Sequence, residues 1–168
     1  MIATLVALLL QASALAAPPR GEGWVQGVSE DGKSFVWTLA DSGGRGASIV
    51  VTCRKLTSAS LSITTKEPLL EMADADDGEI KVILVAGTQR HEVDGKLASN
   101  FHDVTFDRYA ANSLVQRLRT KETVGRELTL ILSNNDRREV YSFMNLDGTY
   151  EERTLTCGKP KRHLTSTP

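Results

Sequence analysis

The sequence has 168 residues, 40% of them hydrophobic and 24% charged, which is the size and composition of one globular domain. Its formal net charge of −1 gives no whole-molecule field that would attract nucleic acid or an anionic membrane. Aromatic residues make up only 5%, which argues against stacking platforms for single-stranded nucleic acid or sugars.

The first residues have the pattern of a secretory signal peptide. An apolar run from Ile2 to Leu10 precedes the small residues Ala14-Leu15-Ala16, and this run is too short to span a bilayer. We expect cleavage after Ala16, so that residues 1–16 are the signal and residues 17–23 a flexible leader. The alternative is a buried N-terminal helix, which Pro18-Pro19 disfavours. The mature protein is therefore expected to be periplasmic or secreted.

Two runs of strand character follow, Trp24 to Val28 and Lys33 to Leu39. Ser29-Glu30-Asp31-Gly32 lies between them and supplies turn residues, so the pattern predicts a β-hairpin. Alternation in the second run places three side chains on one face, which we expect to be the core: Phe35, Trp37 and Leu39.

Trp24 and Trp37 are the only tryptophans in the chain. They are the candidate binding residues, because two tryptophans on neighbouring strands can line a ligand groove. Buried packing is the alternative and is the commoner role of a large aromatic side chain.

The glycine-rich segment Asp41 to Gly46 is expected to be a flexible connection. Phosphate-binding glycine loops lead into a helix, whereas here a strand follows. That strand is Ala47 to Lys55, whose alternation puts Cys53 on the same face as Ile49. A second alternating run, Ala59 to Thr64, should pair with it as an antiparallel hairpin.

Cys53 and Cys157 are the only cysteines. Because the chain is expected to be exported into an oxidising environment, we predict a disulfide between them. The alternative is two separate buried thiols. The bridge would tie the end of the domain to the strand that carries Cys53.

The middle of the chain starts with an acidic segment, Glu71 to Glu79. Its Asp74-x-Asp76-Asp77-Gly78 core is similar to part of a calcium loop, but the twelve-residue register with a terminal Glu is missing. A solvated acidic turn is therefore expected, and no metal site. Ile80 to Val85 is apolar on both faces and predicts a central strand. Asp94-Gly95 predicts a turn before another strand at Val104 to Phe106.

The period then changes to that of a helix. Tyr109 to Lys121 is predicted to form an amphipathic helix, with Gly125 just past its end. Its apolar face comprises Ala110, Leu114, Val115 and Leu118. A last hairpin is predicted from Glu127 to Ser133 and from Glu139 to Met144, with Asn134-Asn135-Asp136 as its turn.

The C-terminal element, Asn145 to Cys157, is open between helix and strand, and Asp147 as a possible N-cap favours helix. The polar tail, residues 159–168, is expected to be disordered. Residues 24–158 then form a single β-rich domain. We predict a mainly β fold, an antiparallel β-sandwich or partly open barrel with one or two short helices.

No catalytic motif is present. His91, His102 and His163 lack metal-ligand spacing, and no G-x-S-x-G motif occurs. We therefore expect a non-enzymatic binding or accessory module without a cofactor, metal site or catalytic residues. The alternative is a small secreted hydrolase whose site the sequence does not reveal, because catalytic groups are assembled in space.

Four segments carry a family resemblance: IVVTCRK, SASLSIT, YAANSLVQRLRTKETVGRELTLIL and YSFMNLDGTYEERTLTC. Over residues 47–158 the chain resembles small exported bacterial domains grouped with invasion-associated locus B proteins and with the TagO-like proteins associated with type VI secretion. It differs at Glu151-Glu152-Arg153, where such domains carry small apolar residues. The resemblance implies a binding or accessory role in the bacterial envelope. The implied partner is another envelope or secretion-associated protein. We expect this chain to bind no nucleic acid and to have no membrane-spanning segment.

Overall fold

The computed structural model describes residues 23–29, 34–54, 58–73, 78–135 and 137–145, and the strands and helices named below are those of these residues. The elements are β1 (Trp24–Val28), β2 (Ser34–Ala40), β3 (Ala47–Arg54), β4 (Ser58–Thr65), the 3-10 helix η1 (Leu70–Met72), β5 (Glu79–Ala86), β6 (Gln89–Leu97), β7 (Asp103–Thr105), α1 (Arg108–Leu118), β8 (Arg126–Asn134) and β9 (Arg137–Asn145).

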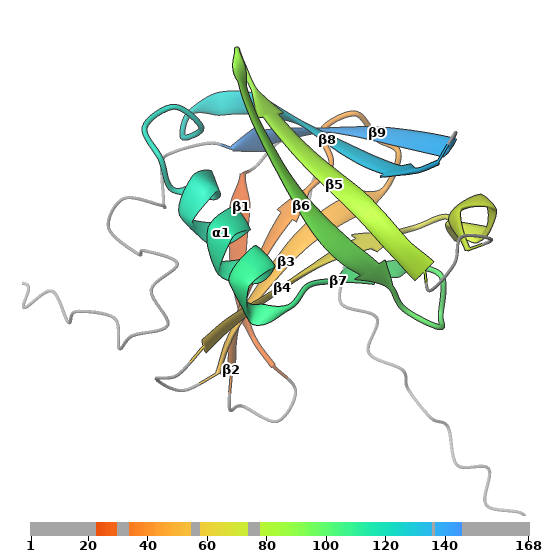
Figure 1. Ribbon diagram of the computed structural model, residues 1–168. Helices are drawn as coiled ribbons and strands as arrows, with labels where there is room; N and C mark the ends of the chain where they lie inside the picture. The colour runs from red at the N-terminus through yellow and green to blue at the C-terminus, as the bar shows by residue number, and fades with distance from the viewer. Residues whose placement is uncertain (1–22, 30–33, 55–57, 74–77, 136, 146–168) are drawn as a thin grey trace, which may run out of the picture.

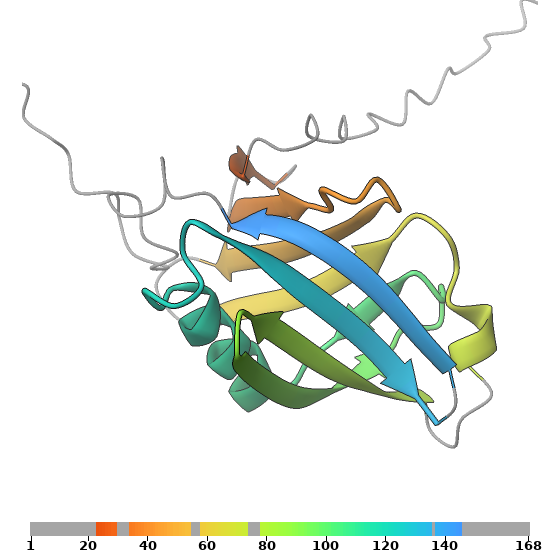
Figure 2. The same ribbon diagram turned by 90° about the horizontal axis from the view of Figure 1, so that it is seen from above.

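All nine strands form one antiparallel sheet in the order β1-β2-β3-β4-β7-β6-β5-β8-β9. Figures 1 and 2 show that the sheet curls, so that β9 at one edge returns toward β1 and β2 at the other. The prediction of a mainly β fold, an antiparallel β-sandwich or partly open barrel with one or two short helices, is confirmed by this open antiparallel sheet and its one α-helix. The hairpins β1–β2, β3–β4 and β8–β9 are also confirmed, and β5 is an interior strand between β6 and β8.

Alternate residues of the strands point into the barrel and fill it. The space between the inner faces of the strands and α1 leaves a void of only about 10 Å³, lined by Ile49, Leu61, Ile63, Leu84, Leu114, Leu118 and Leu130. This is about the volume that a single water molecule needs. The region is therefore a packed core and not a ligand cavity.

Helix α1 lies against β4 and β6. Asp107 caps it, with its Oδ1 accepting a hydrogen bond of 2.7 Å from the N–H of Ala110. The buried side chains are Ala111, Leu114, Val115 and Leu118, so the sequence placed the apolar face correctly except that Ala111, and not Ala110, is buried. The helix ends at Leu118. Past this point a side chain of the following turn satisfies a carbonyl of the last helical turn, because Thr123 Oγ1 donates to the carbonyl of Arg117 at 2.8 Å.

The turn predicted at Asp94-Gly95 is wrong, since both residues lie inside β6. Gly95 is there for close packing. A Cβ on this residue would lie 2.7 Å from Cγ1 of Val104 and 3.0 Å from the ring of Phe106, so only glycine lets β7 approach β6 this closely. The actual reversal between β5 and β6 lies at Gly87, which has a φ of 58°.

The prediction for Phe35 is also wrong. Trp37 and Leu39 are buried as expected, but the Phe35 side chain is 40% exposed. Phe35 pairs with Val28, which is 58% exposed, at the end of the β1–β2 hairpin. The alternation of β2 is correct, but the strand extends beyond the core at this end.

The two edges of the sheet, β9 on one side and β1 and β2 on the other, approach each other along a line that we call the seam. One end of the seam is closed by the buried amide of Asn145, at the end of β9. Its Oδ1 accepts a hydrogen bond of 2.7 Å from the indole N–H of Trp24 on β1. Its Nδ2 donates to the carbonyls of Leu118 and Thr123, each at 3.0 Å. The Asn145 side chain is fully buried and joins both edges of the sheet to the end of α1.

We predict that Asn145→Ala lowers the free energy of unfolding by about 3 kcal/mol, because the Trp24 indole N–H and two carbonyls lose their buried partner. Urea unfolding followed by tryptophan fluorescence measures the loss. The matched control is Asn112→Ala on the exposed side of α1, which should change stability by less than about 0.5 kcal/mol. Equal effects of the two changes would contradict the role assigned to Asn145.

Candidate functional site

A groove of about 730 Å³ lies where the two edges of the sheet separate. One wall is the first half of β9, and the other is the segment 67–72, which includes η1. The lining residues are Arg45, Glu67, Pro68, Leu69, Glu71, Met72, Arg137, Arg138, Glu139 and Tyr141. None of them was singled out as a binding residue from the sequence.

The groove exists because β2 ends early. Next to the end of β2, Asp41 forms an isolated antiparallel bridge with Phe143 of β9, and the N–H of Ser42 donates to the carbonyl of Ser142 at 2.7 Å. Beyond this point the chain leaves β9 and turns into β3. Gly46, with a φ of 80°, makes that turn possible.

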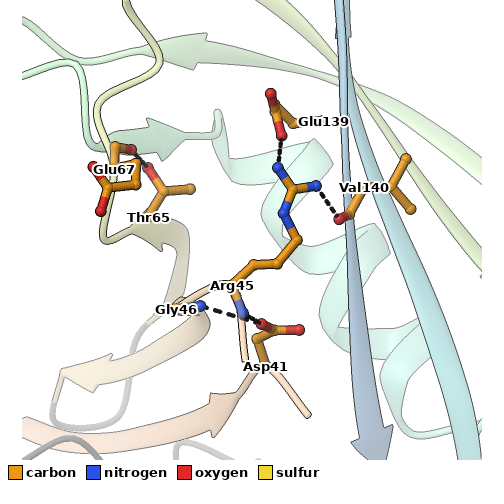
Figure 3. A network of polar contacts seen from close by, with 7 residues as sticks. All are labelled: Asp41, Arg45, Gly46, Thr65, Glu67, Glu139 and Val140. Atoms are coloured by element: carbon orange, nitrogen blue, oxygen red, sulfur yellow. Dashed lines mark hydrogen bonds and ion pairs between the residues drawn. The ribbon is translucent and has the colours of Figure 1, made fainter. Parts of the chain in front are cut away.

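One carboxylate organises the turn. Asp41 is 4% exposed, and its oxygens accept backbone N–H bonds from Gly43 at 3.0 Å, Arg45 at 2.5 Å, Gly46 at 3.2 Å and Ser142 at 3.1 Å. Figure 3 shows the Arg45 and Gly46 bonds. The sequence predicted a flexible connection here. The structure shows a loop that is held by this network, so that prediction is wrong.

The Arg45 side chain reaches from this loop to β9 (Figure 3). Its Nη1 donates to the carbonyl of Val140 at 2.8 Å, and its Nη2 forms an ion pair with Glu139. The guanidinium also lies 5.1 Å from the ring centre of Tyr141, within the range of a cation–π contact. Burial and the charge of Glu139 raise the pKa of Tyr141, so its hydroxyl is protonated at neutral pH. Arg45 therefore closes one end of the groove.

The groove carries three arginines and three glutamates. Arg137 and Glu71 form a second ion pair, at 3.0 Å across the groove. The side chains of Arg138 and Glu67 make no hydrogen bond or ion pair with any residue in the described part of the chain, so charges of both signs remain available. Leu69, Met72 and Tyr141 are buried and supply apolar surface below these charges.

A second polar contact lies elsewhere, between β6 and α1. His91 Nε2 is 2.8 Å from Ser113 Oγ, a distance suited to a base and a nucleophile. Burial, and then the charge of Arg117, lower the pKa of His91, so the imidazole is neutral at pH 7. However, no group of the described residues hydrogen-bonds its Nδ1, and Ser113 lies within a helix whose N–H groups are used by the helix itself. We interpret the contact as one that docks α1 on β6.

His102 and Asp103 do not join His91. His102 Nδ1 lies 2.9 Å from the carbonyl of Thr65, and Asp103 accepts a bond of 2.7 Å from the hydroxyl of Thr64. Both contacts fasten β7 to the end of β4. The structure therefore does not assemble these three residues into one site.

The two tryptophans do not line the groove. Trp24 and Trp37 are 4% and 5% exposed and belong to the core. Cys53 is buried on the inner face of β3, whereas Cys157 lies outside the described residues, so the bridge between them stays a prediction. The signal and leader, the core of the acidic segment at 74–77, and the C-terminal element and tail also lie outside them.

The described residues contain no group of three His, Cys, Asp or Glu side chains that could hold a metal ion. Within the described ranges, no helix is long and apolar enough to cross a membrane. Comparison of the chain with protein-family models, with curated proteins and with solved structures found no match in any of the three. The resemblance to exported bacterial domains stays a prediction.

The lowered pKa of His91 predicts a pH dependence of stability. Because the folded state binds this proton less tightly than the unfolded state, the neutral form favours folding. The free energy of unfolding should therefore fall as pH falls from about 6.5, the unfolded pKa, through the lower folded pKa. Urea unfolding of the wild type and of His91→Gln across this range isolates the effect. Parallel pH profiles for the two proteins would contradict it.

Proposed function

We propose that this chain is an exported, non-enzymatic binding module, and that the groove between β9 and the segment 67–72 holds a partner protein of the bacterial envelope. The observation that carries the proposal is the composition of the groove. The groove combines buried apolar side chains with charges of both signs. It lies in the described chain where the two edges of the sheet separate, beyond the bridge between Asp41 and Phe143.

Size and position support this assignment. A volume of about 730 Å³ is typical of ligand sites, which often lie at the openings of barrels. The interior beside α1 is packed, so the chain does not carry a small molecule there. The two ion pairs of the groove are solvent-exposed, with side chains 35% to 75% accessible, and such pairs are weak enough to exchange for contacts with a partner.

Site-specific photo-crosslinking in the producing cells tests the proposal. A photoreactive residue at position 67 should yield a defined adduct, whereas one at Tyr109, which is 85% exposed on α1, should not. Arg138→Glu should reduce the yield about tenfold, since it reverses an unpaired charge of the groove. Arg119→Glu makes the same charge change on an exposed position next to α1 and serves as the control. Equal losses in the two variants would refute the groove as the binding site.

The proposed disulfide between Cys53 and Cys157 is compatible with the fold. Asn145 lies beside Trp24, and Trp24 is in register through β2 with Ile49, which is four residues from Cys53 on β3. Four residues of strand and three strand spacings separate the end of β9 from Cys53 by roughly 20 Å. Twelve residues from Asn145 to Cys157 span up to about 40 Å, so the chain is long enough.

If the chain is exported as proposed, the mature protein should begin at or near Ala17. If the bridge forms, the mature protein should contain no free thiol. We expect mass spectrometry of the unfolded, unreduced periplasmic protein to show no alkylation, and the reduced protein to take up two labels. Loss of the bridge should lower stability by up to about 4.7 kcal/mol, the entropic figure for a loop of about a hundred residues. Two labels without reductant would overturn the bridge.

A further inference from the structure

The open edge of β9 carries backbone groups that point into the groove. At Ser142 the N–H donates to Asp41 and the carbonyl accepts from the N–H of Ser42 at 2.7 Å, so both groups point away from β8. At Val140 the carbonyl points the same way, since it accepts from Arg45. Backbone direction alternates along a strand with a period of two residues. The N–H of Val140, and the N–H and carbonyl of Arg138, therefore also point away from β8 at this open edge, where Arg138 lines the groove.

These three groups lie where a neighbouring strand would hydrogen-bond. The register Asp41 to Phe143, continued by Ser42 to Ser142, would place the next residues of β2 opposite Tyr141, Val140 and Glu139. The chain turns away at that point, and the groove occupies the position that a continued β2 would fill. A strand placed in the groove would therefore run in line with β2, would find free backbone groups on β9, and would lie beside the segment 67–72.

Building on the proposed function, we infer that the groove receives an extended segment of the partner protein. The segment continues the line of β2 and pairs with Arg138 and Val140 as an added strand. Such pairing uses the main chain of the partner, and its side chains alternate between two faces.

The side chains around the groove define the chemistry of this segment. Leu69 and Met72 of one wall and Tyr141 of the other are buried below the charges, so the residues of the segment that face the barrel interior, every second one, are apolar. The unpaired Arg138 and Glu67 each attract an opposite charge, so the remaining positions include one acidic and one basic residue. The partner segment therefore alternates apolar and polar residues and has little net charge.

Both ends of the described domain lie at the far end of β9 from the groove. The C-terminal segment starts after Asn145, at the other end of β9 from Arg137, which is roughly 27 Å away for a strand of this length. The N-terminal segment joins β1 at Trp24, which contacts Asn145. Both termini begin at the closed end of the seam, so a segment of this chain would first have to run the length of β9 to reach the groove.

The test is selection of a phage-displayed octapeptide library on the full mature protein, followed by NMR with the synthetic peptide of highest affinity. We expect alternating apolar and polar sequences, chemical-shift changes at Arg138 and Val140, and slowed hydrogen exchange of the Val140 amide. N-methylation of alternate peptide nitrogens should weaken binding about tenfold, because it removes main-chain hydrogen bonds but keeps the side chains.

Val140→Pro tests the same contact from the protein side. It removes the N–H that faces the groove without removing a bond to β8, a position at which a sheet edge tolerates proline. Binding should fall about tenfold, whereas the matched control Val140→Thr keeps the N–H and should bind as the wild type does. The N-methylated peptide gives the same comparison without a change in the protein if the proline variant does not fold.

The outcomes separate the inference from the proposed function. Peptides or crosslinked partners that engage the groove but tolerate both N-methylation and Val140→Pro would overturn the added strand and leave the groove as a binding site. A Val140 amide that is already protected without peptide would show that the groove is filled by this chain, which also overturns the inference. Absence of both groove crosslinks and groove-binding peptides would overturn both proposals.

Discussion

The buried carboxylate of Asp41 determines how the barrel closes. Four backbone N–H groups converge on it, three from its own loop and one from Ser142 on the opposite edge of the sheet. These bonds end β2, direct the chain into β3 and attach the two edges at one point. Hydrogen bonds to a charged acceptor are about twice as strong as neutral ones, so one side chain replaces several rungs of a β-ladder. The groove is the part of the seam that this arrangement leaves open.

Asn145 and Asp41 together show why the seam is made by side chains. The edges of a sheet carry unpaired N–H and carbonyl groups, which need partners when the edges approach each other. Asn145 supplies both a donor and an acceptor at the closed end, and Asp41 supplies acceptors in the middle. At the open end Arg45 is the one side chain of the described residues that takes part, and it satisfies the carbonyl of Val140. Fewer backbone N–H and carbonyl groups of β9 have hydrogen-bond partners across the seam toward Arg137, and this is the physical origin of the candidate site.

Local patterns predicted the hairpins, α1 and the strands of the described chain except β6, because alternation, turn residues and helical period are encoded in neighbouring residues. The errors occurred where contacts between segments distant in the sequence determine the local structure. Gly95 was mistaken for a turn because only the proximity of Val104 reveals why glycine is needed in β6. The groove was not predicted because Arg45, Glu71 and Arg137 are ordinary surface charges until the fold brings them together. The one available signal was an aspartate directly before a glycine-rich turn, a combination that caps backbone N–H groups.

The charges on β9 bear on whether its open edge would pair with an identical edge or with the proposed partner. Two copies of β9 paired about Arg138 would place arginines of like charge next to each other, and such pairs destabilise a sheet. In such an antiparallel pairing Arg137 of each copy would face Glu139 of the other, so Arg138 is the one position of this run that disfavours pairing between identical edges. A segment with an acidic residue opposite Arg138 meets no such repulsion and gains the unused backbone bonds. In the proposed binding role, Arg138 would therefore disfavour an identical edge at its own position and favour an acidic residue of the partner.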